Sequence, residues 1–196
     1  MSKITILKPE LMNITTASGE TFVGGCQEWY DDEWQKRAGC GPVTAANIYW
    51  YSMRKNDITP DYTQLILEMF DFVTPGMRGV NTSAMFVDGF LGFVAKHNMQ
   101  VKPCVLEVPT KKSTRPKKSE LSEFVFNALS MDSPVAFLNL SNGTVEALEN
   151  WHWVTIIAFD PKTMLVDIAD HGKVITIDIF EWKKTSLFGG ALVYFI

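Results

Sequence analysis

The pattern of apolar residues changes at Pro134, and this change constrains the fold more than any other feature of the sequence. Before it, apolar residues recur at helical spacing, as in the stretch 86–94. After it, the chain consists of short runs of β-branched or aromatic residues separated by turn residues such as Asp160-Pro161 and His171-Gly172. The predicted strands cover 135–140, 151–159, 164–169, 174–180 and 191–196.

Helices that precede strands in this way predict an α+β fold. We expect a helical half, about residues 27–131, packed against a mainly antiparallel β half, about residues 134–196. The chain has 196 residues, which suits one domain spanning 1–196 and allows burial of roughly 70% of the unfolded surface.

Local signals place further elements within this frame. Residues 3–8 alternate weakly, as in an edge strand, and 14–23 can form a hairpin around Ser18-Gly19. We expect an irregular loop over 24–38 and a strand over 101–108. Predicted helix caps are Thr59, the pair Asn81-Thr82 and Ser119.

The charge balance argues against several classes of partner. With 18 Lys and Arg against 22 Asp and Glu, the net charge is −4, so we expect no affinity for nucleic acid or an anionic membrane. The basic run 111–118 contains a proline and suits a solvated loop. No apolar window reaches the length of a membrane span or signal peptide. Three cysteines, an odd number, suit the reducing cytoplasm.

The stretch Gly39-Cys40-Gly41-Pro42 places a cysteine on the first turn of a helix that runs to about Asn56. Proline suits this turn, where its missing N–H costs nothing. The helix dipole and free backbone N–H groups favour a thiolate there. Cys40 is therefore a candidate nucleophile, although a free cysteine also serves as a small buried apolar residue.

A base and a carboxylate follow in the β half. His152 begins the apolar strand 151–159, and Asp170 ends the next strand. In a hairpin these two ends lie side by side. Asp170 could then accept a hydrogen bond from one ring nitrogen and leave the other for a thiol. Asp167 is the alternative carboxylate, and a core histidine bonded to a backbone carbonyl is the alternative for His152.

These motifs, in this order, resemble the papain-like cysteine peptidases, and more closely the bacterial domains related to bacteriocin leader-processing peptidases. The resemblance covers about residues 27–196. It implies a cleft between a helical and a β half, with Cys40 as nucleophile, His152 as general base and acid, and Asp170 as orienting residue. The activity that the resemblance implies needs no metal or organic cofactor. The chain has Gly39 where leader-processing members often have Asp.

The family also has a glutamine before the cysteine that helps to form the oxyanion hole. Gln35 is expected in this role, five residues before Cys40 where the usual gap is six, and Gln27 is the more distant alternative.

The expected activity is therefore hydrolysis of a peptide or amide bond through a Cys40 thioester. An acyltransferase that uses the same thioester and a silent papain-like binding module are the alternatives.

Cys26 is a second candidate thiol. A zinc site built from cysteine and histidine would lack the usual short ligand spacing. Aromatic residues at Trp34, Trp151 and Trp153 could line a subsite or fill the core.

Overall fold

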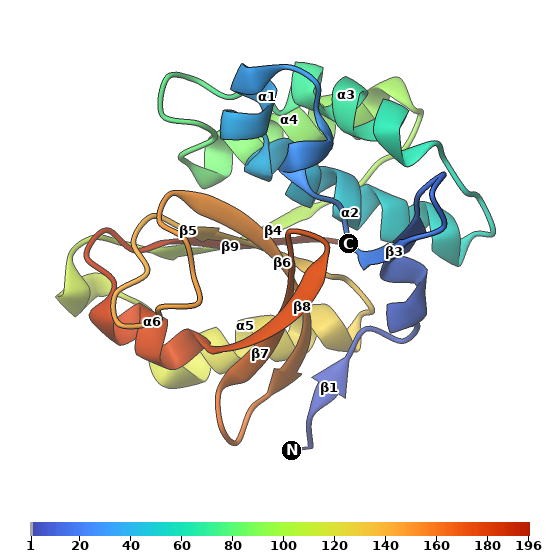
Figure 1. The fold of residues 1–196 in the computed structure, drawn as a ribbon. Helices are drawn as coiled ribbons and strands as arrows, with labels where there is room; N and C mark the ends of the chain where they lie inside the picture. Colours follow the sequence, from blue (N-terminus) through green and yellow to red (C-terminus); the bar gives the residue numbers. More distant parts are fainter. Residues whose placement is uncertain (1) are drawn as a thin grey trace.

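A seven-stranded sheet separates two groups of helices in the computed structural model, which describes residues 2–196 (Figure 1). Its strands follow the spatial order β4-β9-β5-β6-β7-β8, with β1 pairing to β6, and every pairing is antiparallel. The predicted α+β class is confirmed. The strands of this sheet are β1 (Ile4–Thr5), β4 (Pro103–Val108), β5 (Val135–Asn139), β6 (His152–Asp160), β7 (Leu165–Asp170), β8 (Lys173–Asp178) and β9 (Gly190–Phe195).

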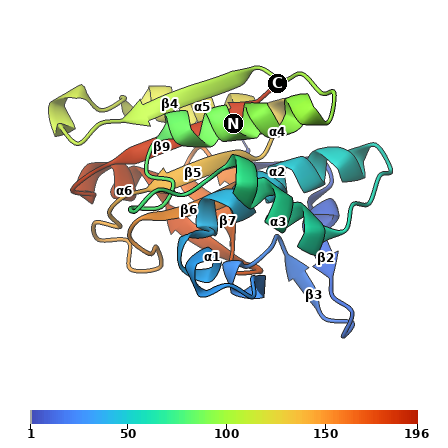
Figure 2. The same cartoon turned by 90° about the horizontal axis from the view of Figure 1, so that it is seen from above.

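Helices cover both faces of this sheet. Figure 2 views the molecule from the side of α1–α4, while α5 and α6 lie on the opposite side (Figure 1). The helices are α1 (Glu33–Ala38), α2 (Cys40–Lys55), α3 (Tyr62–Phe72), α4 (Ser83–Lys96), α5 (Lys118–Ser130) and α6 (Ile179–Thr185). Within residues 2–196, the helices fall short of the length and apolar character that a bilayer-spanning segment requires.

The alternation of side chains along the central strands divides the interior into two cores. On β5, Ala136 and Leu138 face the core beneath α2, α3 and α4, whereas Val135 and Phe137 face the core around α5 and α6. Successive strand residues point to opposite faces, so a strand buried on both sides carries apolar residues at nearly every position. Because both cores pack against the same central strands, the sheet joins the helical half to the β half.

Helix α2 is the most deeply buried helix, because its residues from Cys40 to Tyr51 are all buried. A helix that is apolar on most sides belongs inside a protein. Its one buried amide, Asn47, accepts hydrogen bonds from the Gly25 N–H (2.8 Å) and the Tyr62 hydroxyl (2.6 Å). It also donates to the Thr155 hydroxyl at 3.2 Å. Asn47 therefore links α2 to β6 and to the loop before α1.

Several expected elements are confirmed. The edge strand is β1, the N-terminal hairpin forms from β2 (Asn13–Thr15) and β3 (Thr21–Val23), and Thr82 caps α4 through the Met85 N–H.

Other boundaries differ from the expectation. Asp61 rather than Thr59 caps α3, and α5 begins at Lys118, one residue before the expected cap Ser119. The segment 24–38 is not wholly irregular, because Asp32 caps the short helix α1. The end of the run 174–180 belongs to α6, which Asp178 caps.

Two features of the helical half also differ from the expectation. Strand β4, from within 27–131, joins the sheet beside β9. The basic run is not wholly solvated, because Arg115 is buried and donates to the backbone carbonyls of Pro109, Thr110 and Ser186.

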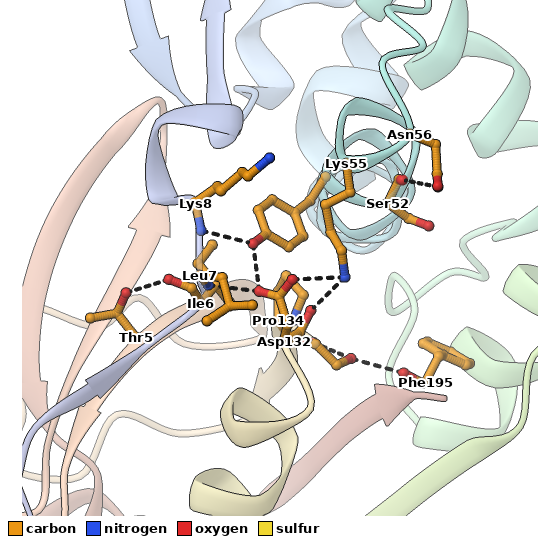
Figure 3. A network of polar contacts seen from close by, with 12 residues as sticks. Thr5, Ile6, Leu7, Lys8, Ser52, Lys55, Asn56, Asp132, Pro134 and Phe195 are labelled. Carbon is orange, nitrogen blue, oxygen red and sulfur yellow. Dashed lines mark hydrogen bonds and ion pairs between the residues drawn. The ribbon is translucent and has the colours of Figure 1, made fainter.

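A polar network around Asp132 fixes the N-terminal segment against α2 and the α5–β5 turn (Figure 3). The Asp132 carboxylate accepts hydrogen bonds from the Leu7 N–H (2.7 Å) and the Tyr51 hydroxyl (2.6 Å), and pairs with Lys55 at 2.8 Å. Burial alone would raise the pKa of Asp132, but these three donors outweigh it, so its pKa lies below the ordinary value. The charged carboxylate therefore stabilises the fold.

We predict that Asp132→Asn lowers the free energy of unfolding by about 1–2 kcal/mol at pH 7, because it weakens charge-assisted hydrogen bonds in a pair whose side chains are 36% (Lys55) and 11% (Asp132) exposed. Asparagine tolerates the positive φ of 56° at this position. A group with a depressed pKa stabilises above its unfolded pKa, about 3.9, and loses that effect as pH falls through its folded pKa. The difference measured by urea unfolding should therefore shrink below pH 4.

Asp57→Asn is the matched control, since Asp57 is an exposed aspartate with a similar φ of 60°. An equal loss of stability in both variants would contradict the assigned role of the Asp132 network.

Candidate active site

Cys40 is the first residue of α2 and lies at the boundary between the helices and the sheet. Gly39 precedes it as the cap residue, and a side chain at Gly39 would collide with the Gln35 carbonyl and the Tyr30 ring. The glycine is thus required by close packing. The thiol is buried in a narrow cavity whose lining includes Cys26, Gln27, Cys40, His152, Asp170 and His171.

His152 and Asp170 meet where β6 begins and β7 ends. The two strands form the expected antiparallel hairpin, with Thr155 opposite Ala169. This register places Nε2 of His152 2.7 Å from Oδ1 of Asp170. The two side chains are only 7% and 10% exposed, so the hydrogen bond is shielded from water and fixes the orientation of the ring.

Cys40 and His152 line the same narrow cavity. Because Nε2 is engaged by Asp170, Nδ1 is the ring nitrogen left for sulfur. Burial raises the pKa of the Cys40 thiol, but hydrogen bonds from His152 and from the backbone of Trp153 and Gly41 outweigh burial and lower it. Burial lowers the pKa of His152, but its bonds to Asp170 and Cys40 raise it above the usual range.

These opposite pKa shifts favour a thiolate–imidazolium pair over a neutral thiol and imidazole. The structure thus brings together three of the four residues singled out in the sequence: Cys40, His152 and Asp170.

The alternative carboxylate, Asp167, is engaged elsewhere. Its Oδ2 lies 2.7 Å from Nζ of Lys3, and its Oδ1 accepts a hydrogen bond from Thr176 at 2.7 Å. Asp167 and Asp170 are three residues apart on one strand, so they face opposite sides of the sheet. Of the two aspartates, Asp170 is the one that contacts His152.

The two glutamines also occupy different places. Gln35 lies half-buried in α1, where its N–H bonds the capping Asp32, and it lines neither of the two cavities that contain Cys40. Gln27 lines the narrow cavity, and its Oε1 is buried without a hydrogen-bond partner among residues 2–196. A buried carbonyl oxygen without an internal partner is available to accept a hydrogen bond from a ligand. The geometry therefore favours Gln27 over Gln35 as a group that reaches the site.

A cysteine–histidine contact lies beside Cys40 and His152, in the same cavity. Sγ of Cys26 is 3.5 Å from Nδ1 of His171, and the His171 ring stacks on His152 with centroids 5.2 Å apart and an interplanar angle of 8°. His171 occupies the β7–β8 turn with a positive φ of 47°, so its expected place in a tight turn is confirmed. The sequence offered no sign of the stacking, because it depends on the path of the turn.

The three tryptophans divide between core and surface. Trp153 is buried, stacks on Phe86 at 4.3 Å and donates its indole N–H to the Val80 carbonyl. Trp34 and Trp151 are 43% and 45% exposed, and both line a second, open cavity beside Cys40.

One group of potential metal ligands lies at the site within residues 2–196. Glu149, His152 and His171 each offer a ligand atom, and these atoms lie within 4.8 Å of one another. However, Nε2 of His152 is already bonded to Asp170, and Glu149 is exposed. These residues suit proton transfer better than a metal centre.

We predict that Asp170→Asn slows alkylation of Cys40 by iodoacetamide at pH 6 by about tenfold or more. Without the carboxylate the imidazolium loses stabilisation, so the pKa of the Cys40 thiol rises. At a pH below that pKa, each unit of rise lowers the thiolate population tenfold. The measurement is the rate of Cys40 modification between pH 5 and 9, followed by peptide mass spectrometry. Asp167→Asn, on the same strand, is the control and should leave the profile within about twofold. Identical profiles for the two variants would refute the role of Asp170.

Neither a comparison with models of known protein families nor one with curated proteins gives a match. The chemistry of the site is therefore inferred from its residues and their geometry.

Proposed function

We propose that this protein is a thiol-dependent hydrolase that cleaves a peptide or amide bond through a thioester on Cys40, in the manner of the papain-like peptidases that its motifs resemble. The observation that carries the proposal is one narrow cavity lined by Cys40, His152 and Asp170, in which Nε2 of His152 lies 2.7 Å from Oδ1 of Asp170. A nucleophile, a base and an orienting acid gathered in one site are typical of nucleophilic catalysis.

The reaction follows from the charges of these groups. The Cys40 thiolate attacks the carbonyl carbon of the amide, and the C–N bond breaks as His152 gives its proton to the leaving nitrogen. Neutral His152 then takes a proton from water, whose oxygen attacks the thioester. The acid product leaves, and the thiolate–imidazolium pair is restored. Asp170 keeps the ring in place throughout.

The oxyanion formed in both steps needs hydrogen-bond donors. The first N–H groups of a helix have no partner within it, so the Cys40 N–H is available at the start of α2. The amide NH2 group of Gln27 supplies the second donor in this proposal, because the Gln27 side chain lines the same cavity as Cys40. One such donor contributes about 3–4 kcal/mol to lowering the barrier. The role expected of Gln35 is thereby assigned to Gln27.

The decisive test is detection of an acyl or inhibitor adduct on Cys40. Intact-mass spectrometry after exposure to a library of peptide aldehydes and peptide vinyl sulfones should show one adduct per chain, mapped to Cys40 and absent in Cys40→Ala. Failure of every probe to modify Cys40 faster than Cys104 would contradict the proposal.

Product analysis with an added amine separates hydrolysis from acyl transfer. The free acid as the main product supports a hydrolase, whereas an amide of the added amine identifies a transferase.

We predict that Gln27→Ala reduces acylation of Cys40 by p-nitrophenyl acetate about 10- to 100-fold relative to its alkylation by iodoacetamide. Acylation passes through an oxyanion and alkylation does not, so the ratio of the two rates isolates the oxyanion donor. Gln35→Ala is the matched control and should leave the ratio unchanged. A fall caused by Gln35→Ala and not by Gln27→Ala would reverse the assignment.

A further inference from the structure

An open cavity of about 360 Å³ adjoins Cys40 on the solvent side. It lies between α1, the loop 76–79 and the residue that precedes β6. Its lining includes Trp34, Arg37, Cys40, Met77, Arg78 and Trp151. Any acyl substrate of Cys40 must approach through open space of this kind, so these side chains are in a position to select it.

The charge of this cavity is opposite to that of the whole protein. The chain has a net charge of −4, yet Arg37 and Arg78 both line the cavity and no acidic residue does. Within residues 2–196, neither guanidinium forms an ion pair with a carboxylate. The start of α2 adds the positive end of a helix dipole.

Two acidic residues lie near Arg37 without forming an ion pair with it. Glu28 and Glu33 border a neighbouring hollow that also includes Arg37. Glu33 is paired with Lys36 at 2.8 Å. Both arginines are therefore free to bind an anion that enters the cavity.

The position of Arg78 is set by a tight hairpin. Gly76 and Gly79 exchange backbone hydrogen bonds of 3.2 and 2.9 Å, and Gly79 has a positive φ of 69°. The next residue, Val80, accepts the Trp153 indole N–H, and a side chain at Gly41 would collide with it. The hairpin is thus anchored against the residues that flank His152 and Cys40.

Apolar side chains surround the two charges. Trp34 and Trp151 are nearly half exposed and Met77 is 98% exposed, although large apolar residues usually avoid water. Their position around one cavity favours a ligand with an apolar portion.

We propose that this cavity is a substrate subsite for a carboxylate, and that the protein acts on peptides bearing an acidic group and a large apolar group next to the scissile bond. Guanidinium groups recognise carboxylates through paired hydrogen bonds, and the carboxylate is the ordinary anionic group of a peptide. This inference rests on the proposed thiol chemistry of Cys40.

The test compares two alkylating reagents of similar size, anionic iodoacetate and neutral iodoacetamide, by mapping modification of Cys40. Free cysteine in the same solution provides the reference ratio of rates. We expect the iodoacetate-to-iodoacetamide ratio at Cys40 to fall several-fold in Arg37→Gln and in Arg78→Gln, and further in the double variant. Added salt should reduce the ratio in the native protein. Changes in thiol reactivity that affect both reagents cancel in the ratio.

Arg54→Gln is the control of equal charge change. Arg54 lies on α2 over the Trp50 ring and away from the cavity, so the ratio should not change. An unchanged ratio in the double variant would overturn the carboxylate subsite while leaving the thiol chemistry intact. If iodoacetamide itself showed no preference for Cys40 over Cys104, the proposed hydrolase would fail instead.

Discussion

The structure depends most on the burial of α2 between the other helices and the sheet. A helix buried from Cys40 to Tyr51 has little freedom to slide or rotate, because shifting a close-packed element opens cavities that cost several kcal/mol. Asn47 adds three hydrogen bonds that fix the position of α2 relative to β6 and to the loop before α1. The position of the thiol is therefore set by packing along the whole helix.

The opposing shifts at Cys40 and His152 illustrate how a buried site holds separated charges. Burial disfavours both ionised groups, yet each charge is compensated by the other and by fixed donors or acceptors. Asp170 contributes the outermost charge, so the three groups alternate in sign from sulfur to carboxylate. Such an arrangement costs stability unless all its partners are present.

The sequence predicts the parts of this site that depend on local pattern. The glycine-flanked Cys40 marks a helix start, and the hairpin between β6 and β7 follows from two apolar runs and a turn. The location of Gln27 could not be predicted, because it depends on how Asn47 holds the Gly25 loop rather than on distance along the chain. The sequence pattern does not predict the two short helices, α1 and α6, although Asp32 and Asp178 cap them. Two helical turns are too few to show a periodic pattern of apolar residues. Arg115 was expected in solvent because its carbonyl partners come from distant segments.

The order of strands has a consequence for biosynthesis. β9 is synthesised after the other strands of this sheet, yet it lies between β4 and β5 in the interior of the sheet. A nascent chain that has reached β8 already carries the cysteine, the histidine and the aspartate, but β4 has no neighbour and both cores are incomplete. Pairing across such long separations is slow and cooperative. The two cores that surround Cys40, His152 and Asp170 are therefore complete only after β9 has been synthesised and has joined β4 to β5.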